Sequence, residues 1–393
     1  MLGPRFVLLA AVILVLGVGP AVASADAGEG AAHAAPAAAE PAPVLDTARA
    51  SAATAPEPAG APGPGVRSEL SSLAPTPAPS PTPTPAPTPT ATPEPTPTPT
   101  PTATPAPSPT APITYRITSF MIVDLPAGKR PYDDLATPDL GVTPAVADAN
   151  GIPMRQVGSK KVYGPVTVAQ WALGMMAGYE RTGDVAYLHR AQAAADVFRS
   201  IGVWSGPALY LPYRFDFALH GKASDTLRSP WYSAMAQGQA LSLMVRIYRA
   251  TGDPADLGMA RALFLSLLHK GRGTAPWVSY VDASRNLWLE EYAEHDPEHT
   301  LNGMIFAIYG LYDYYTLTHD ANAYNMLRGA LTTIRLNVAR FRNPGTVSSY
   351  CLKYPVRSLK YHHIHVAQLI ELTAMTRVTY FASLATALRH DAW

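Results

Sequence analysis

The chain contains little cysteine and no strong excess of charge of either sign. Cys351 is the only cysteine among 393 residues, so no disulfide bond within the chain stabilises its fold. The 30 Lys and Arg residues nearly balance the 29 Asp and Glu residues, and the formal net charge is +1. A polyanion-binding surface over the whole molecule is therefore not expected, and nucleic acid is not a predicted partner. A basic site would have to be local.

Apolar residues are scarce in one long part of the chain, where proline is abundant. Most of the 40 prolines lie between Pro36 and Pro112, in runs such as PTPTPAPTPTATPEPTPTPTPTATPAPSPTAP. Such a segment buries too little apolar surface to offset the entropy lost on ordering. Proline also favours an extended polyproline II conformation. Residues 26–112 are therefore predicted to form a disordered Pro/Thr/Ala-rich stalk.

The first residues have the pattern of an export signal. Arg5 precedes the apolar run FVLLAAVILVLGVG, and AVASADA offers small residues for cleavage. Residues 1–25 are therefore interpreted as a signal peptide. An uncleaved anchor is the alternative, because residues 6–23 are just long enough to span a bilayer. Both interpretations predict a secreted or cell-surface protein, and the second adds a membrane tether.

A weak internal repeat predicts helical hairpins. Asp184, Asp253 and Asp320 are 69 and 67 residues apart (253 − 184 and 320 − 253), and apolar residues follow each at steps of +3, +4 and +3. These steps trace one face of a helix. A helix-like segment precedes each aspartate, and two TGD turns supply a glycine stop and an N-cap. Residues 161–393 are predicted to be mainly α, an (α/α) toroid of repeated hairpins. A small β-containing segment is expected over residues 113–160, with a strand or two in ITYRITSFMIV.

Three polar segments lie between the predicted hairpins, where loops of such a toroid would build a site. They are SPWYSAMAQGQ (229–239), LWLEEYAEHDPEHTLNGM (287–304) and GTVSSYCLKYPVRSLKYHHIHVAQ (345–368). The last segment places a tyrosine and three histidines within five positions. This clustering suggests either a metal site or proton-transfer chemistry.

These segments resemble the C-terminal domain of the D-glucuronyl C5-epimerase family. The resemblance rests on WYSAMAQGQA (231–240), EEY (290–292), LNG with the following IYGLYD (301–313), and YHHIH (361–365). Family members convert glucuronic acid residues of heparosan-type polysaccharide into iduronic acid, and the resemblance implies a largely helical domain. It also implies an anionic uronic-acid polysaccharide as partner and no cofactor. The sequence leaves open whether the chain forms a homodimer.

The reaction implied by the resemblance requires two proton-transfer groups. The proton on C5 lies α to a carboxylate, so its removal creates charge that cations or hydrogen-bond donors must stabilise. Inversion requires removal of a proton from one face and its return to the other. Tyrosine can do both if a neighbouring cation lowers its pKa. The resemblance implies catalytic roles for Tyr292, Tyr350 and Tyr361, and Glu291 could hydrogen-bond a hydroxyl group or a sugar oxygen.

Further residues of the same segments are candidates for binding the sugar. Positive side chains near Tyr350, histidines beside Tyr361 and an amide before the third hairpin could all contact the substrate carboxylate. Trp231 and Tyr232 form either a platform on which a sugar stacks or a cap on the helix ring. Gln237 is better suited to a hydrogen bond with loop backbone than to a contact with substrate. The predicted substrate-binding residues are Trp231, Tyr232, Gln237, Asn302, Lys353, Arg357, His362 and His365.

Other interpretations stay open. His295, His299, His363 and His365 have the ligand type of zinc, but the two pairs lie in different segments and proton abstraction needs no metal, so no metal site is predicted. A uronate polysaccharide lyase on the same toroid would share the first proton removal, and residue types do not separate it from an epimerase. A glycan-binding module and a helical interaction scaffold are the non-catalytic alternatives. The scaffold is disfavoured because packing does not require EEY or YHHIH.

Overall fold

A computed structural model of the protein describes residues 112, 114–271 and 276–392. The predicted signal peptide (1–25) lies outside these residues, and so does the predicted stalk (26–112) apart from Pro112. Among the helices of the described part, none combines the length and the apolar character needed to cross a membrane.

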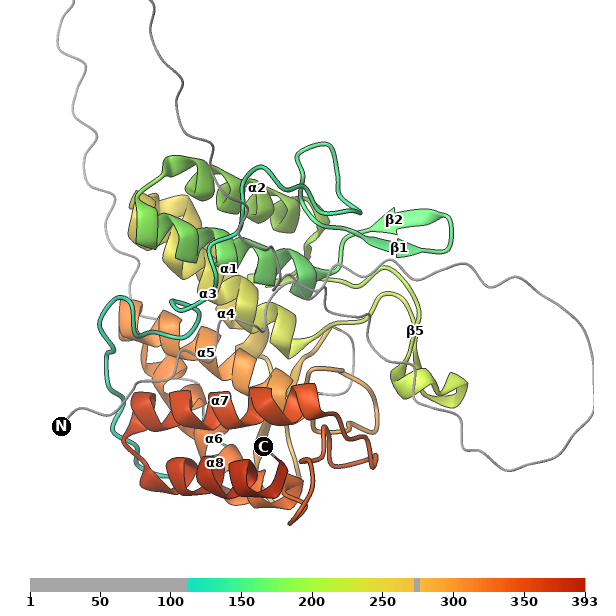
Figure 1. The fold of residues 1–393 in the computed structure, drawn as a ribbon, viewed down its shortest axis with the longest axis vertical. Helices are drawn as coiled ribbons and strands as arrows, with labels where there is room; N and C mark the ends of the chain where they lie inside the picture. The colour runs from blue at the N-terminus through green and yellow to red at the C-terminus, as the bar shows by residue number, and fades with distance from the viewer. Residues whose placement is uncertain (1–111, 113, 272–275, 393) are drawn as a thin grey trace, which may run out of the picture. The chain divides into compact units, whose positions relative to one another are not determined.

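Eight α-helices in the described residues form four consecutive hairpins (Figure 1). In each hairpin the first helix lies in an inner layer, where α1 packs on α3, α3 on α5, and α5 on α7. This layered array of paired helices confirms the mainly α, toroid-type prediction. The pairs are α1 (Pro165–Thr182) with α2 (Val185–Ile201), α3 (Ala234–Thr251) with α4 (Pro254–Leu268), α5 (Leu301–Thr318) with α6 (Ala321–Asn337), and α7 (Leu359–Thr376) with α8 (Thr379–Ala392).

The second helix of the first three hairpins begins at the aspartate that the repeat identifies. The carboxylates of Asp184, Asp253 and Asp320 accept hydrogen bonds of 2.8–2.9 Å from backbone N–H groups of the first helical turn. The glycine of each TGD turn ends the preceding helix in the left-handed region. His319 takes that conformation in the third turn, with φ of 54°. The aspartate is therefore the constant part of this turn.

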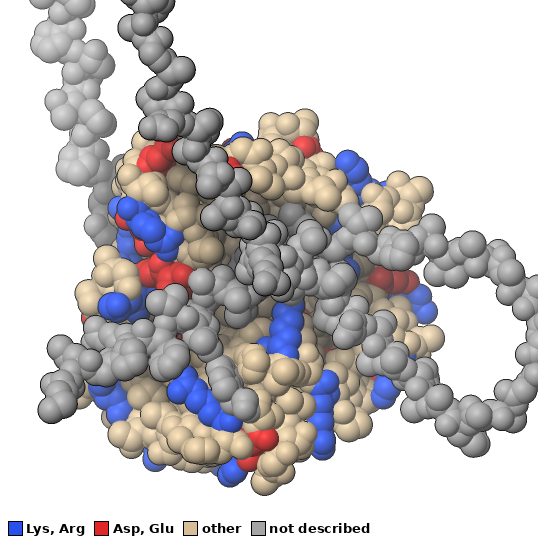
Figure 2. Space-filling view, in the orientation of Figure 1, with Lys and Arg blue, Asp and Glu red and all other residues tan. Residues whose placement is uncertain are grey.

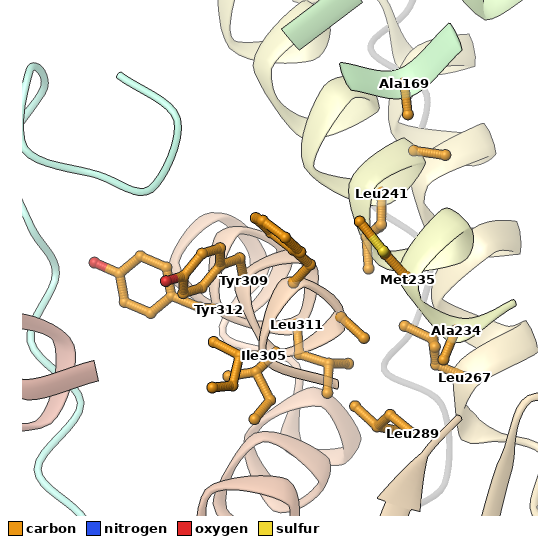
Figure 3. Packing of buried hydrophobic residues seen from close by; sticks show 14 of the residues in the cluster. Ala169, Ala234, Met235, Leu241, Leu267, Leu289, Ile305, Tyr309, Leu311 and Tyr312 are labelled. Atoms are coloured by element: carbon orange, nitrogen blue, oxygen red, sulfur yellow. The ribbon is translucent and has the colours of Figure 1, made fainter. Parts of the chain in front are cut away.

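The core is centred on the contact between α3 and α5, whose backbones approach closely. A Cβ atom on Gly310 of α5 would lie 2.7 Å from the Cα of Gly238 in α3, so this crossing has no room for a side chain at position 310. Figure 3 shows Met235 of α3 near Leu311 of α5 in the surrounding apolar core. This close packing gives the segments that enter α3 and α5 a rigid base.

Four two-stranded antiparallel hairpins occur in the described chain, between or before the helices. One of them, at residues 155–162, crosses the end of the region 113–160 where a small β element is predicted. The pairs are β1 (Arg155–Val157) with β2 (Lys160–Val162), β3 (Val203–Ser205) with β4 (Ala208–Tyr210), β5 (Phe217–Ala218) with β6 (Thr226–Leu227), and β7 (Ser279–Val281) with β8 (Leu287–Leu289); short 3-10 turns are η1 (Leu219–Gly221), η2 (Ala223–Asp225) and η3 (Val338–Phe341).

The prediction of a strand in ITYRITSFMIV is wrong. Residues 114–124 form no strand. Their backbone makes single hydrogen bonds to other parts of the domain, such as Val123 N to Met375 O (2.9 Å) at the end of α7. Tyr115 and Phe120 are buried against the helices. The weak alternation of this segment therefore reflects packing of an extended chain on helices, and we call residues 114–135 the N-terminal strap.

A chain that begins at residue 112 is expected to keep the stability of the full chain, whereas one that begins at residue 136 is expected to lose several kcal/mol. The strap buries Tyr115, Phe120 and Leu125, and full burial of one large apolar side chain contributes ~1.5–3 kcal/mol. Urea unfolding followed by circular dichroism measures the difference. Equal unfolding midpoints for the two truncated chains would contradict a stabilising role of the strap.

Candidate active site

The segments that precede α3, α5 and α7 meet at one end of the inner helices, on the right in Figure 1. Backbone hydrogen bonds hold them together. Ala234 N at the start of α3 donates to Glu290 O (2.7 Å), and Leu301 N at the start of α5 donates to Tyr350 O (3.2 Å). Leu352 N donates to Glu298 O (2.9 Å). The convergence expected from the repeat is thus present.

The four predicted catalytic residues lie together in this region. Tyr292 and Tyr350 have their hydroxyl oxygens 3.1 Å apart, and the Tyr350 hydroxyl donates to Glu291 Oε1 at 3.1 Å. Tyr361 of α7 packs on Tyr350, with ring centroids 4.5 Å apart and ring planes inclined by 57°. We call Glu291, Tyr292, Tyr350 and Tyr361 the tyrosine–glutamate cluster. Its hydrogen bonds give a path along which a proton can move.

Burial changes the acidity of this cluster. It raises the pKa of Glu291 to about 8. Burial, with the Glu291 charge as the next cause, also raises the pKa values of Tyr292, Tyr350 and Tyr361. The sequence-based expectation was a tyrosine pKa lowered by a neighbouring cation, so the direction of the shift is the opposite. Glu291, and not a phenolate, is the group that ionises most easily near neutral pH.

The cations predicted near Tyr350 lie in different surroundings. Lys353 Nζ is 3.3 Å from Glu294 Oε1 and 3.2 Å from Asp296 Oδ2, so its charge is already paired. Arg357 is exposed. Lys360 Nζ lies 5.8 Å from the centroid of the Tyr361 ring. Lys353 is not among the groups that shift the pKa values of the three buried tyrosines.

A glycine of the LNG motif makes room for Glu291. A Cβ atom on Gly303 of α5 would lie 2.5 Å from Glu291 Cβ and 2.8 Å from its Cδ. Within the described part of the chain, Glu291 Oε2 is buried and has no hydrogen-bond partner. Buried polar atoms normally have partners. This oxygen could therefore take up a proton without losing an existing hydrogen bond.

Substitution of Gly303 by Ala is expected to destabilise the protein by ~1–3 kcal/mol, because the new methyl group overlaps the Glu291 side chain. Urea unfolding measures the change. Gly258→Ala on α4 is the matched control, since a Cβ there meets nothing within 4 Å and alanine favours a helix over glycine by about 1 kcal/mol. A Gly303→Ala protein as stable as the control would contradict the steric argument.

Two predicted substrate ligands are already used within the fold. Gln237 has no exposed surface; its side chain accepts from Leu211 N and donates to Leu209 O. His362 is equally buried, accepts from Ser348 N and lies 2.9 Å from Leu388 O. Their assignment as substrate ligands is therefore corrected, because neither has a free polar atom. They hold neighbouring segments in place.

Two further predicted ligands are buried but retain a free polar atom. His365 Nδ1 lies 2.8 Å from Ser348 Oγ, whereas its Nε2 has no partner among the described residues. Asn302 Oδ1 is also buried without a hydrogen-bond partner among the described residues. Burial lowers the pKa of His365 to about 3, so its imidazole is neutral. YHHIH also lies within the first turns of α7, which begins at Leu359, and not in the loop before it.

The predicted sugar platform is part of an aromatic wall. Trp231 is buried and stacks on Tyr213, with ring centroids 3.8 Å apart and planes 7° from parallel. Its Nε1 donates to Phe215 O at 2.9 Å. Phe217 stacks against both Trp231 and Tyr292, at centroid distances of 5.8 and 6.0 Å. Trp231 is therefore a support for Tyr292, and the interpretation as a packing residue fits its surroundings better than a free platform.

A groove of about 290 Å³ lies along this wall, and none of the four cluster residues lines it. Trp231 and Tyr232 line it together with Trp277, Arg228 and Glu294. The Trp231 ring is 6.0 Å from the Tyr292 ring, which connects the groove with the cluster. Aromatic surface combined with charged groups suits a polar sugar chain. In Figure 2, basic and acidic side chains are interspersed on the visible described surface, in keeping with the small net charge.

The two histidine pairs considered as zinc ligands do not form a site. His299 Nδ1 lies 2.7 Å from Glu290 Oε1, and its ring stacks on Trp288. Within the described residues, one group of three side chains has metal-ligand spacing: His220, Glu298 and Cys351. Sequence reasoning missed this group, because its members are far apart in the chain and only the fold brings them together.

Residues 208–389 match a family model described as D-glucuronyl C5-epimerase C-terminus. A D-glucuronyl C5-epimerase of Caenorhabditis elegans is 33% identical over 84 residues, which are 21% of this chain and 13% of that protein. The match thus spans a small part of the relative's length.

Two solved structures are similar to this chain at low scores. A GH76 α-mannanase of Bacteroides thetaiotaomicron has a TM-score of 0.41 and 14% identity, with 65% of this chain and 62% of that chain covered. An unsaturated glucuronyl hydrolase of a Bacillus species has a TM-score of 0.39 and 15% identity, with 58% and 60% covered. Scores this low do not bear on function. The family match includes the whole tyrosine–glutamate cluster: residues 208–389, somewhat less than half of the chain, are similar to the D-glucuronyl C5-epimerase C-terminus.

Proposed function

We propose that this domain inverts C5 of D-glucuronic acid residues in a heparosan-like polysaccharide and produces L-iduronic acid. The hydrogen-bonded chain of Tyr292, Tyr350 and Glu291 is the main support. It combines a carboxyl group that ionises near neutral pH with hydroxyl groups that stay protonated. Inversion needs these two kinds of group, a proton acceptor and a proton donor.

In the proposed first step, Tyr350 takes the C5 proton while its own hydroxyl proton moves to the Glu291 carboxylate. The electron pair of the C–H bond passes to the sugar carboxylate and forms an enolate. The 3.1 Å bond between Tyr350 and Glu291 Oε1 supplies the required contact. Coupling the two transfers avoids a free phenolate, which the raised tyrosine pKa values disfavour.

In the proposed second step, the Tyr361 hydroxyl returns a proton to C5 from the opposite face. Burial raises the pKa of Tyr361, so this group is protonated and ready to act as an acid. Its oxygen takes up a proton from solvent as it gives one to C5, so no free phenolate forms in this step either, and Glu291 releases the proton it accepted. No cofactor takes part in this scheme, and the partner is an anionic uronic-acid polymer.

The groove lined by Trp231 is proposed to hold a neighbouring sugar of the polymer. Arg228 lines it and could contact a uronate carboxylate, while Trp277 and Tyr232 offer apolar edges. The signal-like residues 1–25 support a further proposal, that the enzyme acts on polymer outside the cytoplasm.

Incubation of the protein with heparosan in heavy water tests the function. Deuterium at C5 without new unsaturated chain ends is the expected result. Ultraviolet absorbance from unsaturated uronate would instead show a lyase, which removes the same proton and then expels the 4-linked sugar. Binding of the polymer with neither change would indicate a glycan-binding module.

A further inference from the structure

Three side chains lie close together next to Tyr350 and take no part in the proposed proton transfers. His220 Nε2 lies 2.7 Å from Glu298 Oε2 and 3.9 Å from Cys351 Sγ. One potential ligand atom from each residue lies within 4.8 Å of the other two. The three residues come from η1, from the segment before α5 and from the segment before α7. The fold thus gathers an imidazole, a carboxylate and a thiol at one point.

We propose that His220, Glu298 and Cys351 bind a divalent transition-metal ion with the preferences of zinc. Zinc takes these three ligand types at 2.0–2.3 Å, and a tetrahedral site then spaces its ligand atoms about 3.3–3.7 Å apart. The observed separations of 2.7 and 3.9 Å lie on either side of this range. Movement of the imidazole away from Glu298 and towards Cys351 would bring both of these separations into the range. Calcium and magnesium are disfavoured, because they select oxygen ligands.

The burial of the three residues suits an ion that enters from one side. The Glu298 side chain has no exposed surface, and Cys351 is buried, whereas 11% of the His220 side chain is exposed. Thr300 Oγ1 donates to Glu298 Oε1 at 3.1 Å, which leaves Oε2 for the ion. A buried carboxylate and a thiolate together need positive charge beside them, and a divalent cation would supply it.

The backbone around the three residues favours a built site over a chance contact. His220 has φ of 52° and ψ of 27°, the left-handed region that a residue with a Cβ atom seldom adopts. Cys351 is held by a backbone bridge to Thr300, two residues after Glu298. Two of the ligands thus lie on paired segments, and an unusual turn presents the third to them. Such backbone conformations concentrate at functional sites.

The ion would position Tyr350 and would not itself move the C5 proton. Cys351 directly follows Tyr350, and the His220 ring meets the Tyr350 ring edge to face at a centroid distance of 5.7 Å. Coordination would fix the segment of Tyr350 against the start of α5. Three protein ligands leave a fourth position, which water can occupy.

Cobalt titration of the full chain after treatment with a chelator tests the site directly. One Co²⁺ per chain should bind, with a thiolate-to-cobalt charge-transfer band that Zn²⁺ displaces. Cys351→Ser should abolish the band, and both Cys351→Ser and His220→Asn should weaken binding at least about tenfold, as expected for loss of one of three ligands. His189→Asn is the matched control, because His189 is exposed on α2, and it should bind as the parent does.

The proposal is overturned if the parent binds no stoichiometric Co²⁺, or if Cys351→Ser and His220→Asn titrate as the parent does. Far-ultraviolet circular dichroism of the metal-free variants shows whether each is folded. If Cys351→Ser is unfolded, binding by His220→Asn decides the question. The titration uses no polysaccharide, so it gives an answer even if the proposed epimerase activity is absent.

Discussion

Replacement of Glu291 by Gln is expected to lower the rate of heparosan epimerisation by about 10²–10⁴-fold, the usual contribution of a general acid or base. Glutamine keeps the shape of the side chain but cannot accept the proton that Tyr350 passes on. Initial rates of C5 deuterium incorporation measure the loss. Glu180→Gln, at the opposite end of α1 from the site, is the control and should keep the parental rate.

The pH dependence of the same variant gives a second test. Glu291 must be ionised to accept a proton, so kcat/KM of the parent should rise with pH and level off above about pH 8. Glu291→Gln should lack this rise.

The stability of the parent should fall as the pH rises, whereas its kcat/KM should increase. The folded state keeps the Glu291 proton up to about pH 8, whereas the unfolded chain releases it near the ordinary pKa of 4.5. The free energy of unfolding of the parent should therefore fall between these pH values, and Glu291→Gln should remove that part of the fall. The proposed role of Glu291 would be contradicted if the variant had the same pH dependence as the parent, both in kcat/KM and in the free energy of unfolding.

Tyr350→Phe and Tyr361→Phe are both expected to abolish net epimerisation, but they should differ in hydrogen exchange. If the two hydroxyl groups serve opposite faces of the sugar, each variant keeps one of them. The remaining group can still remove the C5 proton of one epimer and return it to the same face. One variant should therefore incorporate deuterium into glucuronate and the other into iduronate, which NMR distinguishes.

Phenylalanine removes only the hydroxyl group, so a folding defect is not expected in either variant. Tyr324→Phe on α6 is the control, since Tyr324 stacks on Tyr315 away from the cluster, and it should epimerise at the parental rate. Exchange of the same epimer by both variants would contradict the two-face assignment. Tyr292, whose hydroxyl oxygen is 3.1 Å from that of Tyr350, would then be the next candidate for the second group.

The helical hairpins could be predicted because their signals are local. The spacing of apolar residues and the aspartate of each turn act within one or two helical turns. The strap could not be predicted in this way, because its burial depends on helices that come much later in the chain. Periodicity predicted a strand in ITYRITSFMIV (113–123), whose described residues bond to side chains and helix ends rather than to another strand.

The site was predictable in part for a similar reason. The resemblance identified Glu291 and the three tyrosines, and the fold brings them together. The direction of their pKa shifts depends on burial and, for the tyrosines, on the nearby Glu291 charge, which sequence does not display. The three-residue spacing of His362 and His365 indicates that both side chains lie on the same face of a helix. That face is buried, which explains why both contact Ser348.

The N-terminal strap also sets the order in which the domain can fold. Thr118 N bonds to Thr332 Oγ1 across 214 positions, and Leu125 N bonds to the Tyr312 hydroxyl across 187 positions. Hairpins built from neighbouring segments need little loop closure, whereas contacts over such separations form slowly. During synthesis the strap emerges before the helices that receive it. Because Val123 also requires the C-terminal end of α7, we expect the strap to dock last, after α7 has been made.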